Sequence, residues 1–327
     1  MGILSFLFGR NSRKSPHRIG QNSAHSVTFD ENLLHIGSLN YFGFYETSET
    51  GEWVVSWLDS DRENHVGGFR EQGHGRFILY NKIEDTIILD SKFERPNHGH
   101  VANTGFCTVE DWMFGNGLMG TFYALSPVGE VVIERYFEAN IYNSAISPKG
   151  ILAVCQTCNA KCDDGNKLTA FEISSGRQLF SVTPSTGWAD RYEFDEDSYQ
   201  IIVVHDRIGK FRYDIKGTFL DTQKFDADKL MSDDSVSILL TVEQNLKTET
   251  SQEELEYLLK STLRAKSLQV KEPNGWDSVA LKLEGITLEK LGRIDKAIVA
   301  YQEALSLNPK IGVAKRLSTL QKKLKAE

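Results

Sequence analysis

Short apolar runs separated by Gly, Asn, Asp and Ser dominate the chain from about residue 40 to residue 224. Their period is close to two, which is typical of half-buried β-strands. Segments such as Pro148-Lys149-Gly150 and Ser174–Arg177 separate the runs. Proline presets the first turn residue and glycine tolerates positive φ, so these segments are expected to be tight turns. The pattern predicts a series of consecutive strands.

One motif recurs along this stretch at intervals of about 45 residues. Its copies begin at Gly75, Gly120, Asn166 and Gly209, so the intervals are 45, 46 and 43 residues. A strand-rich repeat of this length has the size of a four-stranded propeller blade. Outer strands are expected at 87–89, 131–133 and 218–220. Strands near Leu33–Gly37 and Val236–Val242 could supply a fifth blade that closes the ring.

The third copy of the repeat carries a family resemblance. Residues 145–153 (AISPKGILA) and 168–176 (LTAFEISSG) resemble a blade of a WD40-type β-propeller. Phe171-Glu172 stands where that family carries Trp-Asp, so the resemblance extends to the propeller architecture rather than to a subfamily. It implies a rigid platform for protein–protein contact, and it does not name a reaction.

After about residue 225 the apolar period changes from two to 3.6, which is typical of amphipathic helices. Helices are expected at 251–268, 278–291, 294–307 and 313–325. Residues 278–309 resemble one tetratricopeptide repeat (TPR), because the small, aromatic and proline positions of that family are occupied by Gly285, Leu288, Gly292, Ala297, Tyr301, Ala304 and Pro309. One such repeat cannot bury its own apolar face, so the flanking helices are expected to pack against it.

These patterns together predict a β + α fold class. A β-propeller with four clear blades, and strands for a fifth, is followed by a small α-helical TPR-like solenoid. The expected domains are a flexible basic arm at 1–26, the propeller at 27–245 and the helical domain at 246–327. Most of the aromatic residues in the β region are expected to pack between blades, and a minority could serve as binding anchors on a propeller face.

The net charge of −8 is unevenly distributed. Residues 1–20 carry +4 and residues 310–327 carry +5, so the body between them carries −17. An acidic body repels phosphate backbones, which argues against nucleic acid as a partner. No apolar run reaches the length of about 20 residues that a membrane-spanning helix needs.

The N-terminal segment does not match a targeting signal. Its apolar residues, Ile3–Phe8, precede the basic residues, whereas a secretory signal has the charges first. Phe6 occupies the position where N-myristoylation requires Ser or Thr. A cytoplasmic protein is therefore expected. Weak contact of this apolar segment with an anionic membrane remains an alternative.

Three motifs could carry chemistry, and each has a simpler structural explanation. Residues 115–120 spell G-x-G-x-x-G, but the run leads into an expected strand, whereas a dinucleotide site needs a helix there. Cys155, Cys158 and Cys162 could hold a soft metal ion, although no fourth ligand is adjacent and Cys155 lies in an expected strand. His98-Gly99-His100 places two rings on one side of an extended chain, without the pattern of a zinc hydrolase. No cofactor, metal or catalytic residue is predicted.

The two resemblances favour a non-enzymatic scaffold that binds protein or peptide partners through the TPR groove and a propeller face. In peptide-binding repeats of this type, the first helix of each pair lines the groove. Here that face would offer Val279, Lys282, Ile286, Glu289 and Lys290. Lys282 matches a position that often holds an acidic C-terminus, whereas Ile286 replaces the polar residue usual beside it. The alternative is an enzyme with a metal-assisted hydrolytic site in the blade loops.

Overall fold

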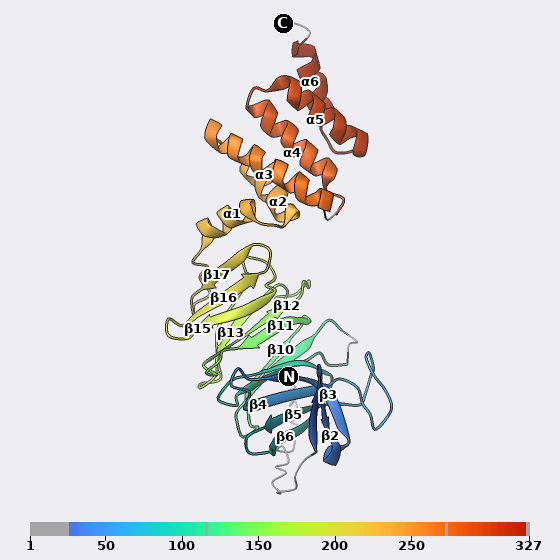
Figure 1. The fold of residues 1–327 in the computed structure, drawn as a ribbon, viewed down its shortest axis with the longest axis vertical. Coiled ribbons are helices and arrows are strands. Elements are labelled where there is room, and N and C mark those ends of the chain that lie inside the picture. The colour runs from blue at the N-terminus through green and yellow to red at the C-terminus, as the bar shows by residue number, and fades with distance from the viewer. Residues whose placement is uncertain (1–25, 115–116, 272–273, 325–327) are drawn as a thin grey trace, which may run out of the picture. The chain divides into compact units, whose positions relative to one another are not determined.

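The computed structural model describes residues 26–114, 117–271 and 274–324 (Figure 1). The chain divides into two compact units. The first comprises the described residues up to Ile202 together with Tyr213–Thr218, and the second comprises Val203–Arg212 and the described residues from Phe219 onward. The basic arm expected at 1–26 lies, apart from Ser26, outside the described residues.

The strands form four sheets in which neighbours along the chain are also neighbours in the sheet. The first sheet comprises β1 (Val27–Asp30), β2 (Leu33–Ile36), β3 (Tyr41–Thr47), β4 (Trp53–Leu58), β5 (Gly75–Asn81) and β6 (Thr86–Phe93), with the 3-10 helix η1 (Gly37–Leu39) between β2 and β3. The second comprises β7 (Pro96–Val101), β8 (Cys107–Asp111), β9 (Gly120–Leu125) and β10 (Val131–Phe137). The third comprises β11 (Ile141–Ile146), β12 (Leu152–Thr157), β13 (Leu168–Glu172) and β14 (Arg177–Val182). The fourth comprises β15 (Arg191–Asp195), β16 (Gln200–His205) and β17 (Gly209–Tyr213).

The sheets follow one another as the blades of a β-propeller do. β3 contacts β7, β7 contacts β11 and β11 contacts β15, so one strand of each sheet faces its counterpart in the next. Apolar clusters fill the space between successive sheets; Trp57 and Phe77 of the first sheet pack with Val109 of the second. The predicted fold class, propeller-type sheets followed by helical repeats, is confirmed.

The two described segments that could have supplied a fifth blade do not form one. Leu33–Ile36 becomes β2, which pairs with β3 and joins the first sheet together with β1. Val236–Val242 lies in a helix, where the Asp234 side chain accepts a hydrogen bond from the Val236 amide. The outer strand expected at 218–220 is also absent from the described residues, because the fourth sheet ends at β17.

The second unit contains six helices among its described residues. They are α1 (Thr222–Met231), α2 (Ser235–Asn245), α3 (Gln252–Lys271), α4 (Asp277–Lys290), α5 (Ile294–Leu307) and α6 (Ala314–Leu324). The last four correspond to the four predicted helices. The first two lie within the range 27–245 assigned to the propeller, where Val236–Val242 was expected to be a strand. α2 packs against both α3 and α4.

Helices α4 and α5 pack closely against each other through small residues. A Cβ atom added to Gly285 of α4 would lie 2.5 Å from the ring of Tyr301 on α5. Ala297 and Tyr301 have no exposed surface. Glycine and alanine therefore allow the two backbones to approach until the tyrosine ring fills the space between them.

We expect Ala297→Asp to destabilise the helical unit on the order of 3 kcal/mol or more, because it places a carboxylate in a site without exposed surface. The control is Val299→Asp, since Val299 lies on the same helix and is 52% exposed. Thermal unfolding followed by circular dichroism at 222 nm should show a lower transition for the first variant alone. Equal melting curves would contradict the buried α4–α5 contact.

The connection between β4 and β5 is held by one buried carboxylate. Asp61 is 1% exposed and accepts hydrogen bonds from the Asn64 side chain at 2.8 Å and from the backbone amides of Asn64 and His74 at 3.1 Å. The Asn64 side chain contributes most to lowering the pKa of Asp61 to about 2. The charged form of the carboxylate is thus the one that stabilises this connection.

A carboxyl whose folded pKa is depressed contributes stability above its unfolded pKa, and that contribution is lost as pH falls toward the folded pKa. For Asp61 the window runs from about pH 4 down to about pH 2. We expect Asp61→Asn to cost about 2 kcal/mol at pH 7 and progressively less across this window. Urea unfolding at pH 7 and at low pH, with the exposed Glu71→Gln as control, measures the difference. A cost that does not change with pH would contradict the argument.

Candidate functional site

The predicted binding residues on α4 contact the neighbouring helix α2. The Lys282 ammonium lies 2.8 Å from a Glu243 carboxylate oxygen, and Lys290 donates to the Leu246 carbonyl at 2.7 Å. The hydrogen bond from Lys282 lowers the pKa of Glu243. Lys282 is 26% exposed and its partner Glu243 34% exposed, so solvent reaches both members of the pair.

The other predicted residues on α4 have structural partners as well. Glu289 accepts a hydrogen bond from the Tyr301 hydroxyl at 2.7 Å and an ion pair from Arg316 of α6 at 3.0 Å. Burial, and then the Glu289 carboxylate, raise the pKa of Tyr301. Val279 and Ile286 are half-buried and pack against the helical core. Ion pairs thus connect α2 to α4 and α4 to α6.

A second site lies where one strand of each sheet faces its counterpart in the next sheet. Residues of β3, β7, β11 and β15 line a cavity of about 590 Å³, which contains charged and aromatic side chains together. Glu110 of β8 is buried at its wall and accepts a hydrogen bond from the Ser144 hydroxyl of β11 at 2.7 Å. Burial raises the pKa of Glu110.

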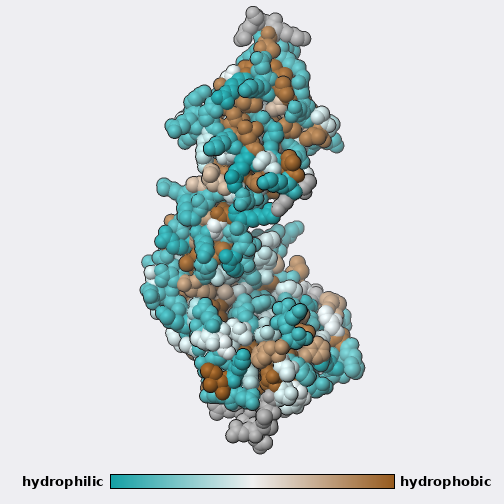
Figure 2. Space-filling model, viewed as in Figure 1, coloured by the Kyte–Doolittle hydropathy of each residue, from teal (hydrophilic) through white to brown (hydrophobic). Residues whose placement is uncertain are grey.

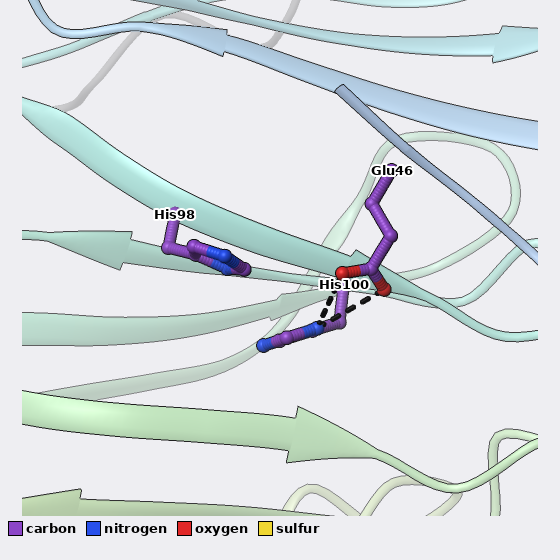
Figure 3. Close-up of side chains that lie close together, drawn as sticks. All are labelled: Glu46, His98 and His100. Atoms are coloured by element: carbon purple, nitrogen blue, oxygen red, sulfur yellow. Dashed lines mark hydrogen bonds and ion pairs between the residues drawn. The ribbon is translucent and has the colours of Figure 1, made fainter. Parts of the chain in front are cut away.

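Two histidines and a glutamate meet in this cavity (Figure 3). The rings of His98 and His100, both on β7, have centroids 4.6 Å apart, and the Trp57 ring lies 4.6 Å from His98. His100 Nδ1 lies 2.9 and 3.0 Å from the two carboxylate oxygens of Glu46 on β3. Among the residues that the structure describes, this is the group of metal-ligating side chains whose ligand atoms all lie within 4.8 Å of one another.

The two histidines have opposite electrostatic environments. Burial lowers the pKa of His98 to about 4, and the nearby His100 adds to this effect. Burial also opposes the charged form of His100, but its hydrogen bond to Glu46 and the charge of that carboxylate raise its pKa. The pKa values of two rings on one strand are therefore shifted in opposite directions, because His100 hydrogen-bonds Glu46 and burial dominates at His98.

The cysteine candidates are not gathered into a ligand set. Cys155 of β12 has no exposed surface, and burial raises the pKa of its thiol well above the usual value. A metal ion binds the thiolate, which burial disfavours here. The Cys162 thiol contacts the Glu138 carbonyl at 3.2 Å. The absence of a metal at these cysteines stays a prediction.

The glycine-rich motif at 115–120 lies partly outside the described residues. Its described end, Gly120, begins strand β9. The helix that would hold a pyrophosphate at its N-terminus is therefore absent from the described residues after the motif.

The partners at both sites were not predicted from the sequence. Glu243 lies in α2 and Leu246 caps its C-terminus. Because Val236–Val242 of this helix was expected to be a strand, the contact of α2 with α4 was not expected. Glu46 lies 52 residues before His98, in a different sheet. The pairing of His98 with His100 could be seen in the sequence, whereas the carboxylate that faces them becomes visible only in the fold.

Comparisons with known proteins support the helical assignment. The family model described as tetratricopeptide repeat matches residues 278–311, which cover α4 from its second residue and all of α5. No curated protein matches the chain. Among solved structures, the chain is similar to "Structure of Dos1 propeller", with 12% identity and a TM-score of 0.37 over 60% of this chain and 57% of that one. It is also similar to a chain of "Crystal Structure of Mitotic Checkpoint Complex", with 8% identity and a TM-score of 0.36 over 67% and 74% of the two chains.

Both structural likenesses are too distant to carry an argument about function, and the chain spans little more than half of the Dos1 propeller chain. None of the helices among the described residues combines the length and the apolar character needed to cross a bilayer. Residues 278–311 thus match a tetratricopeptide repeat, and they lie among further helices that follow the propeller-type sheets along the chain.

Proposed function

We propose that the protein is a non-enzymatic scaffold that binds a protein or peptide partner through the surface of α2, α4 and α6. This surface is called the ion-pair face here, after the pairs Glu243–Lys282 and Glu289–Arg316. The supporting observation is that these pairs connect the first helices of successive helix pairs while their charged groups remain partly exposed. Tetratricopeptide repeats present such a surface to partners.

The chemistry of the ion-pair face favours an acidic segment with apolar side chains. Lys282, Lys290 and Arg316 bring three positive charges, against two from Glu243 and Glu289. Leu240 of α2 and Leu324 of α6 are large apolar side chains that are 50% and 47% exposed. On the visible side of the helical unit, apolar and polar residues are interspersed (Figure 2). A partner carboxylate could replace Glu243 at Lys282 without leaving an unpaired buried charge.

We further propose that a face of the propeller binds a second partner. Tyr142 and Trp188 stack with their ring centroids 5.3 Å apart, and they are 40% and 44% exposed. Exposed aromatic pairs of this kind are typical binding anchors.

All four cysteines are free, which supports a cytoplasmic location.

The test reverses charge on the ion-pair face of the full-length protein. We expect Lys282→Glu/Lys290→Glu to weaken binding of a captured partner at least tenfold, because two attractive charges become repulsive. The control is Lys260→Glu/Lys296→Glu, two exposed lysines on α3 and α5, which changes the net charge equally. Affinity capture with mass spectrometry identifies the partner, and calorimetry with the purified partner measures its Kd.

A charge swap separates binding from folding. Lys282→Glu/Glu243→Lys keeps an ion pair between α2 and α4 and should retain the thermal stability of the helical unit. If the partner recognises Lys282 itself, the swapped variant should bind the partner as weakly as Lys282→Glu/Lys290→Glu does. If partner binding is unchanged in both the charge-reversal and the charge-swap variant, the partner does not bind this face. Catalytic turnover that depends on residues of the blade loops would reject the scaffold function.

A further inference from the structure

The cluster of Glu46, His98 and His100 lies outside the ion-pair face and has no role in the proposed scaffold function. Its carboxylate comes from β3 of the first sheet and its imidazoles from β7 of the second. The three ligand atoms lie within 4.8 Å of one another and face a cavity of about 590 Å³. Imidazole and carboxylate are ligands of first-row divalent metals, and zinc binds both in tetrahedral sites.

We propose that Glu46, His98 and His100 bind one Zn²⁺ ion that links the first sheet to the second. Zinc binds imidazole nitrogen and carboxylate oxygen at about 2.0–2.2 Å, so the ligand atoms of one site lie closer to one another than the 4.8 Å that bounds this group. Glu46 and His100 are already within 3.0 Å. Only the His98 ring has to close on the pair.

Of the three side chains, His98 gives the clearest indication that the cluster binds an ion. Its Nδ1 atom is buried and has no hydrogen-bond partner among the described residues. Its ring is held between Trp57 and His100, and in Figure 3 it extends from β7 toward the other two side chains. A buried imidazole usually satisfies its nitrogens, and one that does not is a candidate ligand.

The contact between Glu46 and His100 serves both states of the site. Without an ion, His100 Nδ1 and the carboxylate share a hydrogen bond. With an ion, the same two groups act as ligands and the proton between them is released. The alternative interpretation is an ion pair that never binds metal, and it is an outcome of the test below.

The location of the site determines what zinc would do there. β3 and β7 contact each other, yet they belong to different sheets and are separated in sequence by three strands of the first sheet. An ion held by both strands would join the two sheets near the cavity. Because the ion binds the folded form, it should raise the thermal stability of the first unit.

The experiment uses the full-length protein after dialysis against EDTA and titrates it with ZnSO₄ at pH 7.5 by calorimetry. We expect one ion per chain and a higher melting temperature with zinc. His98→Ala and His100→Ala should each weaken binding by at least tenfold. The controls are His35→Ala, which removes an exposed histidine, and Cys158→Ser/Cys162→Ser, which removes the competing ligands.

A spectroscopic measurement on the unaltered protein guards against variants that fail to fold. Co²⁺ bound to nitrogen and oxygen gives visible bands without the near-ultraviolet charge transfer that thiolate ligands produce. Visible bands alone support the proposal. A thiolate band, binding lost in the cysteine variant, binding unaffected by both histidine variants, or no stoichiometric binding at all would each overturn it.

Discussion

Both parts of the molecule depend on the close approach of neighbouring elements at a glycine. A Cβ atom on Gly99 of β7 would lie 2.7 Å from the Phe77 ring and 2.8 Å from the Thr108 carbonyl, so only glycine lets β7 pack there. In the helical unit, Gly285 has the same role against Tyr301. Gly99 stands between His98 and His100, and the residue that allows the second sheet to approach the first therefore also brings both imidazoles toward Glu46.

The regular parts of the fold could be predicted because their signals are local. Turn residues and period-two runs located the strands of the second and third sheets, and the small positions of the repeat located α4 and α5. The predictions were wrong where the position or type of a segment depends on the elements against which it packs. Leu33–Ile36 would be a strand both in a fifth blade and in the first sheet, and the sequence does not show that it pairs with β3. Val236–Val242 is rich in β-branched residues, and a short buried helix has the same apolar run as a buried strand.

In the candidate sites, too, the residues that share one element could be predicted, and those from other elements could not. The sequence indicated that Lys282 and Lys290 lie on one helix and that His98 and His100 lie on one side of a strand. It could not indicate Glu243, Leu246 or Glu46, because these reach the sites from other helices or sheets. Charged groups are paired across elements that are distant in sequence, so a site whose ligands come from two sheets becomes visible only once the sheets are packed.

The partners of these charges also determine how each site can work. On the proposed ion-pair face, an incoming acidic group would replace Glu243 as the partner of Lys282, so this exchange would add more to the specificity and orientation of binding than to its affinity. At the Glu46 cluster, the proposed Zn²⁺ ion would displace a proton, and the imidazole and carboxylate that share this proton would become ligands of the ion. The first site therefore responds to the sequence of a partner, and the second to the supply of metal. The residues of the ion-pair face belong to the second compact unit, and those of the Glu46 cluster belong to the first.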